Sequence, residues 1–276
     1  MSEVKAADVA KLRKATGAGM MDCKNALVES NGDFEKAIEL IRERGKAIAN
    51  KRADRDAGEG VALAKANASG SLGAMIVLNC ETDFVAKNTS FIALAQSILD
   101  LALEKKPATL DALKELEIDG RKVGDLVMVQ SGVTGEKFEL SFYDKIEAAK
   151  VIPYIHPGNK LATLVGLNKA DVDTQVGRDV AMQVAAMNPV AVDKDFVSEE
   201  TCKKEFEIGR EQARLEGKPE NILDKIAEGK LQKFFKESTL LNQDFVKDNK
   251  VTVRQHLQQI NKDLTVTSFK RVSLNG

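Results

Sequence analysis

The chain has 276 residues, which is long enough to bury hydrophobic cores in two or more domains without disulfide bonds. Its 41 basic and 42 acidic residues give a net charge of -1, so no overall field would attract nucleic acid or an anionic membrane. The widely spaced cysteines, the lack of signal-peptide regions and the lack of a membrane-length apolar run lead us to expect a cytoplasmic protein.

The N-terminal region, residues 5–44, is predicted to form three short helices, and we assign residues 1–55 to this module and its linker. The glycines of residues 16–19 separate the first helix from the second. Met20 and Met21 open the second helix; we expect them to be partly buried, although methionine is also common on partner-binding surfaces. A bundle of this size is marginally stable alone and is suited to docking.

A charged segment follows the third helix. Its basic residues, between Lys46 and Arg55, are interrupted by Asp54, and no aromatic side chain is present on which a base could stack. We therefore interpret the segment as a solvated linker helix rather than as a nucleic-acid site. Gly58 and Gly60 then mark the expected start of a sheet domain.

Two later parts of the chain show the same order of elements: two short apolar strands joined by a turn, a polar connection and an amphipathic helix. We expect each to be an α+β subdomain in which helices cover one face of a small antiparallel sheet. The first subdomain is assigned to residues 56–142 and the second to residues 143–276. The matching segments are 61–66, 74–78 and the helix from Phe91 in the first, and 151–155, 161–167 and 176–187 in the second.

Charged residues dominate two further predicted helices within residues 198–237, which have few apolar positions. We expect a helical hairpin that projects from the second subdomain as an insertion of about residues 193–240. A last strand at residues 265–274 is expected to complete the second sheet. Between the two subdomains, residues 137–142 alternate as a strand does, while the pattern of residues 123–134 is ambiguous.

The stretch Asn79–Lys87 carries a carboxylate beside a phenyl ring, Asp83 and Phe84, in the connection between a strand and a helix. Asn88 supplies helix-capping chemistry just after it, so we expect a loop held at both ends by packed elements. Short polar loops normally carry no phenylalanine. The residues alone leave two interpretations: Phe84 folds back onto the core beside a solvated Asp83, or the loop presents both side chains to a partner.

The sequence lacks the motifs of common catalytic sites. Its two histidines, His156 and His256, have no metal-ligand spacing, so we expect no metal and no cofactor. No Walker loop, G-x-S-x-G elbow or zincin motif occurs. A hydrolase that uses Glu81, Asp83 and His156 is one alternative, but no residue pattern supplies a nucleophile or an oxyanion hole. We therefore expect a protein that is not an enzyme.

Two long motifs resemble those of bacterial elongation factor Ts: T-G-A-G-M-M-D-C-K at residues 16–24, followed by N-G-D at 31–33, and N-C-E-T-D-F-V-A-K at 79–87. Weaker similarity extends through residues 198–240 and 251–253. The resemblance implies an N-terminal module similar to ubiquitin-associated domains, two related subdomains and an inserted helical hairpin. It also implies a nucleotide-exchange factor for the GTPase elongation factor Tu, which speeds the release of GDP.

The resemblance further implies how the second motif acts. In the family, the matching loop enters the GTPase domain of the partner near its magnesium site. The residues of this chain that take that role are Thr82, Asp83, Phe84 and Val85.

The N-terminal module of the family also touches the GTPase domain, which implies contacts at Met20, Met21 and Lys24. His156, at the turn of the second subdomain, is implied as a contact with another domain of the partner. No direct binding of nucleic acid or membrane is implied. The competing class is a non-enzymatic RNA- or ribosome-binding protein, which the near-zero net charge and the lack of surface aromatic clusters disfavour.

Overall fold

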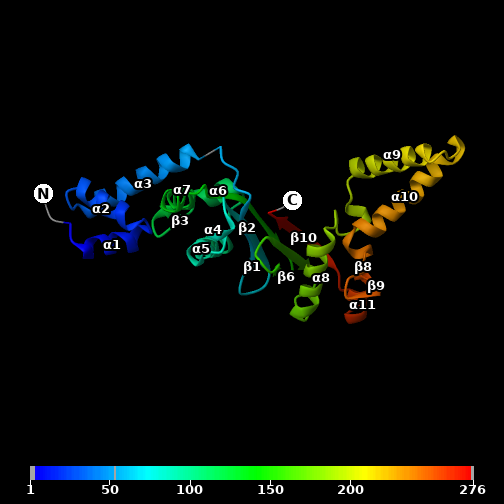
Figure 1. The fold of residues 1–276 in the computed structure, drawn as a ribbon. Coiled ribbons are helices and arrows are strands. Elements are labelled where there is room, and N and C mark those ends of the chain that lie inside the picture. Colours follow the sequence, from blue (N-terminus) through cyan, green and yellow to red (C-terminus); the bar gives the residue numbers. More distant parts are fainter. Residues whose placement is uncertain (1–3, 53, 275–276) are drawn as a thin grey trace.

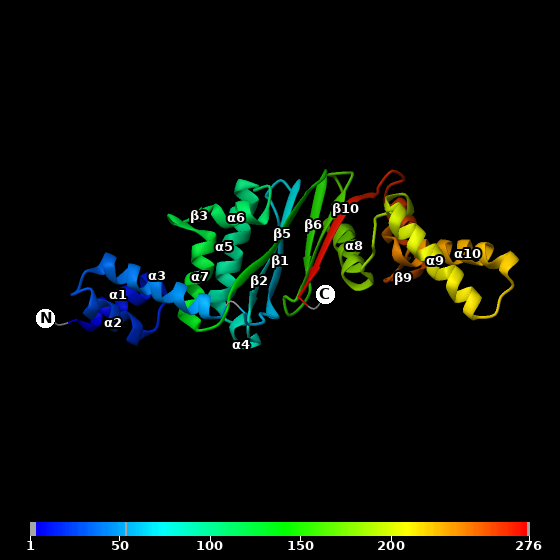
Figure 2. The ribbon, with the colours of Figure 1, turned by 90° about the horizontal axis from the view of Figure 1, so that it is seen from above.

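The computed structural model describes residues 4–52 and 54–274 of the chain. A helical module lies at one end, two small sheets lie in the middle, and a helical hairpin projects at the other end (Figures 1 and 2). Helices and antiparallel sheets are both present, so the predicted α+β class is confirmed.

The N-terminal module consists of α1 (Ala6–Thr16), α2 (Met20–Glu29) and α3 (Phe34–Lys51). Gly17 ends α1 in the left-handed conformation, with φ of 74°, which a residue with a side chain adopts less easily. The buried side chains of Leu12 and Leu27 pack in the small core of the module. The third helix is longer than predicted, because it continues to Lys51 and includes the first part of the expected linker.

A close helix crossing joins this module to the rest of the protein. The partner of α3 is α7 (Val123–Thr134), the segment whose sequence pattern was ambiguous. A methyl group built on Gly132 of α7 would lie 2.2 Å from Cα of Gly45 on α3, so the two backbones touch where neither residue has a side chain. Two glycines therefore set the separation of these helices.

The first sheet has the strand order β1 (Glu59–Ala66), β2 (Leu72–Cys80) and β5 (Glu139–Glu147), with both pairs antiparallel. Helix α5 (Thr89–Lys105) packs on β1 and β2, and Asn88 caps its first turn as expected. Three smaller elements complete this part of the protein: α6 (Leu110–Glu115), β3 (Glu117–Ile118) and β4 (Arg121–Lys122).

The second sheet repeats this topology. Its order is β10 (Val266–Ser273), β7 (Leu161–Leu167) and β6 (Lys150–Ile155), and α8 (Thr174–Met187) packs on β6 and β7. In both sheets the strand that comes last in the sequence, β5 or β10, pairs with the second strand of the hairpin, β2 or β7. The predicted repeat and the predicted role of the last strand are therefore confirmed.

The two sheets face each other through a shared apolar layer. Met75 and Val77 of β2 and Ala162 and Leu164 of β7 are buried in this layer, while α5 and α8 cover the outer faces. The order of layers is thus helix, sheet, sheet, helix. Central strands with both faces covered are apolar nearly throughout, which explains why β2 does not alternate.

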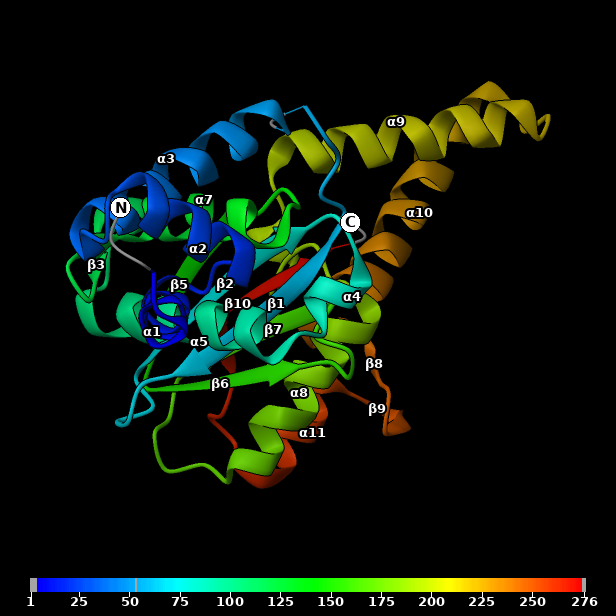
Figure 3. The ribbon, with the colours of Figure 1, turned by 60° about the vertical axis from the view of Figure 1, so that its left-hand side comes forward.

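Helices α9 (Glu199–Leu215) and α10 (Leu223–Ser238) form the predicted hairpin, which projects from the second sheet (Figure 3). The expected domain boundary between residues 55 and 56 stays a prediction. At the expected boundary between residues 142 and 143, strand β5 continues from one side to the other. The remaining elements are β8 (Asp244–Phe245), β9 (Asp248–Thr252), α11 (Val253–Ile260) and short 3-10 helices at Lys194–Phe196, Glu220–Ile222 and Leu240–Asn242.

We expect Gly132→Ala and Gly229→Ala to change stability in opposite directions, although both glycines lie inside helices. The methyl group at Gly132 must push α7 away from the backbone of Gly45, which is expected to cost about 1–3 kcal/mol. Gly229 of α10 has open space at its Cβ position, so alanine there is expected to stabilise the helix by about 0.5–1 kcal/mol. Chemical unfolding measures both changes, and a Gly132→Ala variant as stable as the parent would contradict this packing.

Candidate functional site

The second motif begins in the last residues of β2 and continues into a single helical turn. Helix α4 (Asp83–Ala86) is only four residues long, whereas the sequence predicted a loop. Thr82 precedes it as the N-cap, and its side-chain oxygen accepts a hydrogen bond from the backbone N–H of Val85 at 3.4 Å. This cap stabilises a turn that periodicity could not reveal. The turn lies beside the ends of β1 and β2 (Figure 3).

The ring of Phe84 points away from the protein. Its exposed fraction of 83% is the largest among the exposed large hydrophobic side chains that the structure describes. The side chains of its neighbours point inward: Ala86 is buried in the core between the first sheet and α5, and Val85 is partly buried against that core. The interpretation in which Phe84 folds back onto the core is therefore wrong. Burying an exposed phenylalanine stabilises a complex by about 1.5–3 kcal/mol, so this ring is suited to contact another surface.

One carboxylate holds the start of the turn. Glu136, just after the end of α7, accepts a hydrogen bond from the backbone N–H of Thr82 at 3.1 Å and a second from the hydroxyl of Thr82 at 2.6 Å. Thr82 is therefore bonded on both sides: its hydroxyl donates to Glu136 and accepts from Val85. The apolar periodicity of the sequence gives no signal for this contact, because 54 positions separate the two residues.

A second carboxylate, that of Glu81, accepts hydrogen bonds from three donors. The backbone N–H of Lys137 donates to it at 2.7 Å, and the guanidinium groups of Arg52 and Arg55 lie 3.1 and 3.0 Å away. The side chain of Glu81 is only 14% exposed. Arg52 and Arg55 belong to the segment predicted as a solvated linker, and both pair with Glu81, while 56% of the Arg55 side chain stays exposed.

The titration of the site follows from these contacts. Burial raises the pKa of the Cys80 thiol to about 12, so this cysteine is not a thiolate nucleophile at neutral pH. Burial by itself would raise the pKa of Glu81, but the hydrogen bonds from Lys137, Arg55 and Arg52 outweigh it and lower that pKa. The hydrogen bond from Lys87, 2.6 Å away, lowers the pKa of Asp83. All three groups thus have one protonation state near neutral pH.

The turn that carries His156 lies at the same end of the two sheets as α4. Within this turn, the carbonyl of Asn159 accepts a hydrogen bond from the backbone N–H of Ala62 in β1 at 2.6 Å, and Lys160 pairs with Glu59 at 2.8 Å. His156 itself is exposed and shares a hydrogen bond of 2.9 Å with the hydroxyl of Tyr154. Phe84 and His156 are therefore presented from neighbouring segments.

Met20, Met21 and Lys24 form a separate surface on the first part of α2. The two methionines are 58% and 64% exposed and Lys24 is exposed, so the expectation that the methionines are partly buried is wrong. Cys23 and Ala26 fill the core from the other face of the same helix. Helix α2, which carries the methionines, belongs to the helical module, whereas α4 lies at the end of the first sheet (Figure 2).

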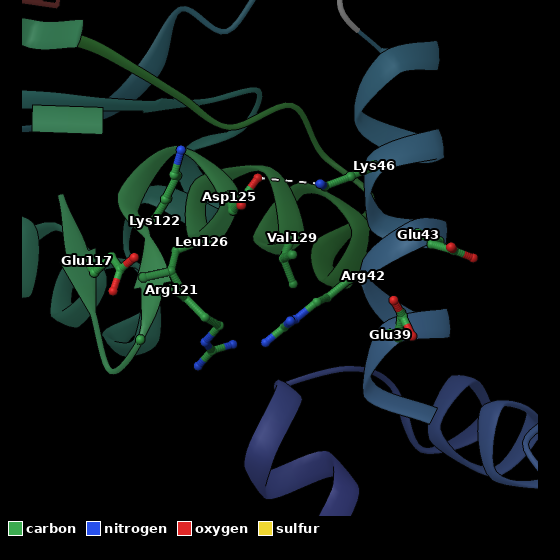
Figure 4. A pocket seen from close by; sticks show the side chains of 11 residues that line it. Glu39, Arg42, Glu43, Lys46, Glu117, Arg121, Lys122, Asp125, Leu126 and Val129 are labelled. Carbon is green, nitrogen blue, oxygen red and sulfur yellow. Dashed lines mark ion pairs between the residues drawn. The ribbon is translucent and has the colours of Figure 1, made fainter. Parts of the chain in front are cut away.

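The described residues contain no group of three or more metal-ligating side chains that could hold an ion. A hollow of about 360 Å³ between α3, α7 and the β3–β4 hairpin is lined by four acidic and four basic side chains, so it has no net charge to select a ligand (Figure 4). None of the predicted site residues lines this hollow. Over residues 4–52 and 54–274, every helix is too short or too polar to cross a membrane.

Comparison with known proteins identifies the family that the chain is similar to. The family model described as Elongation factor TS matches residues 81–275. Two relatives named Elongation factor Ts, from Porphyromonas gingivalis and Amoebophilus asiaticus, are each 55% identical, over 270 and 271 residues; they align with 98% of this chain and with 97% and 98% of their own lengths. A third relative of that name, from Cytophaga hutchinsonii, is 48% identical over 278 residues and the full length of both chains.

The fold is α+β, with a helical module at one end and a helical hairpin at the other. Together with the full-length relatives, it defines a translation elongation factor, which acts in protein biosynthesis. The chain belongs to the elongation factor Ts family. The resemblance inferred from residues 16–24 and 79–87 is thereby confirmed.

We expect Glu81→Gln to reduce stability in a pH-dependent manner. Because the folded-state pKa of Glu81 lies below its ordinary value of 4.5, its charge stabilises the fold above that pH, and this contribution is lost as the pH falls through the folded-state pKa. The difference in Tm between parent and variant should be largest near pH 7 and should shrink below pH 4.5. Glu228→Gln, at an exposed position of α10, is the control; a pH-independent difference for Glu81→Gln would contradict the assignment.

Proposed function

We propose that this protein promotes the release of GDP from the GTPase elongation factor Tu by inserting the α4 turn near the partner's magnesium site. The name of its full-length relatives supports a role in elongation, and the exposed ring of Phe84 on a firmly held turn is the observation that carries the mechanism. On this proposal the protein binds and releases its partner in the cytoplasm and performs no covalent step.

The chemistry of the partner explains why a small displacement suffices. Tight binding of GDP in a P-loop GTPase depends on backbone amides that surround the phosphates and on a magnesium ion with well-placed ligands. An aromatic side chain that enters between the supporting side chains shifts these groups and weakens their hold on the nucleotide. Because the coupling is reciprocal, GDP must weaken the binding of this protein by the same factor.

The four residues of the turn then have two tasks. Phe84 is the wedge, and Asp83 exchanges its exposed contact with Lys87 for hydrogen bonds to the partner, which costs little because exposed ion pairs contribute little. Thr82 and Val85 hold the turn, since the first is bonded to Glu136 and the second packs against the core. The group enters the partner as one unit.

The wedge needs help from other surfaces. Moving a partner from mostly closed to mostly open takes about 5.5 kcal/mol of differential binding, whereas burial of one phenylalanine supplies about 1.5–3 kcal/mol. We propose that Met20, Met21 and Lys24 of the N-terminal module and His156 of the second subdomain supply further contacts. All four are exposed, which supports this assignment. An interface spread over residues 1–55, 56–142 and 143–276 explains an elongated protein (Figure 1).

We expect Phe84→Ala to slow the release of a fluorescent GDP analogue from elongation factor Tu by about 10- to 100-fold at saturating concentration, which corresponds to the loss of one buried ring. Binding to nucleotide-free elongation factor Tu should weaken by a similar factor, whereas binding to its GDP complex should weaken much less, because the ring is buried only when the site is open. Phe196→Ala removes another exposed ring, 71% exposed against 83% for Phe84, which lies outside the site, and serves as the control. Equal losses of affinity for the nucleotide-free partner and for its GDP complex in Phe84→Ala would argue against a wedge.

A further inference from the structure

The α4 turn is too short to hold its own shape. A helix of one turn fixes several backbone dihedral angles for very few hydrogen bonds and is unstable in isolation. Within α4 and its cap, the backbone N–H groups of Ala86 and Lys87 donate to the carbonyls of Thr82 and Asp83, each at 3.1 Å. The direction of the Phe84 ring must therefore depend on contacts outside the turn.

Those contacts come from the ends of two helices that cross. Helix α7 ends at Gly135, with φ of 72°, and Glu136 follows at once; its backbone N–H donates to the hydroxyl of Thr134 at 3.2 Å. This fixes the backbone from which the Glu136 carboxylate reaches Thr82. Beyond the end of α3, Arg52 and Arg55 reach Glu81, the residue before Thr82.

The two supports share one frame. Lys137 connects them, because its backbone N–H donates to Glu81 and its ammonium group donates to the carbonyl of Arg55 at 3.2 Å. Further back, α3 and α7 touch at Gly45 and Gly132, which sets the spacing between their ends. The two carboxylates at the start of the turn, those of Glu81 and Glu136, thus depend on the same pair of helices.

We propose that Glu136 is a positioning residue for nucleotide exchange, which orients the Phe84 ring through Thr82, with Glu81 as its second support. This inference rests on the proposed function of Phe84. Glu136 accepts both of its bonds from Thr82, so it acts on the turn and not on the partner. Without these bonds the turn samples other orientations, and insertion must then restrict that freedom each time the partner binds.

The first test uses the free protein. Glu136→Ala is expected to speed hydrogen exchange at the amides of Ala86 and Lys87 by roughly tenfold, the factor that corresponds to one net hydrogen bond. Amides inside α5 should exchange as in the parent protein. Glu115→Ala removes an exposed carboxylate that pairs with Lys122 at 2.5 Å and is the matched control. Unchanged exchange at Ala86 and Lys87 would overturn the inference without any reference to the partner.

The second test is a double-mutant cycle on GDP release from elongation factor Tu. Glu136→Ala should slow release by about tenfold in the parent protein and should have almost no effect when Phe84 is already alanine, because the residue then has no ring to orient. Glu136→Gln, which keeps one acceptor oxygen, should lie between the parent and Glu136→Ala. A general loss of structure would instead add to the effect of Phe84→Ala.

The outcomes separate the two proposals. If the parent protein does not speed GDP release, the proposed function fails, whatever the exchange data show. If the parent and Phe84→Ala behave as expected but the effects of Glu136→Ala and Phe84→Ala are additive, the proposed function stands and the positioning role of Glu136 is wrong. Thermal unfolding of each variant checks that the compared proteins are folded.

Discussion

The packing of one small sheet against another is the constraint from which the rest of the architecture follows. On β2, Met75 and Val77 face the second sheet while Ile76 and Leu78 face α5, so neither face can be left in water. A helix must therefore cover each outer face, and the strand ends must meet along common edges. One of these edges carries both α4 and the turn of His156.

Carboxylates turn this frame into a rigid support for an exposed ring. Glu81 is held by Arg52, beyond the end of α3, and by the backbone N–H of Lys137, beyond the end of α7. Glu136, just after α7, accepts the hydrogen bonds of Thr82 and so restricts the turn that follows. Charge-assisted hydrogen bonds of this kind are stronger than those between neutral groups. The exposed ring of Phe84 contributes favourable burial only when another surface covers it.

Much of the architecture could be predicted because it depends on local patterns. The two hairpins, the helices that cover them, the projecting α9–α10 pair and the strand β10 all follow from apolar periodicity and from turn residues. Elements whose surroundings are decided by tertiary packing could not be predicted in this way. Helix α7 has apolar residues on two opposite faces, because it lies between α3 and the core of the first subdomain. Its sequence therefore lacks the one-sided apolar periodicity of an amphipathic helix. The exposure of Met20 and Met21 was missed because composition does not distinguish core methionine from surface methionine.

The order of residues along the chain was sufficient to place Asp83 and Phe84 in one short connection and to associate that motif with the elongation factor Ts family. It was not sufficient to say that the ring faces solvent or what holds it there. That depends on Glu136, 54 positions from Thr82, and on Arg52, 29 positions from Glu81. Hydrogen bonds between such distant positions form only after the helices have packed, and no periodicity in the chain encodes them.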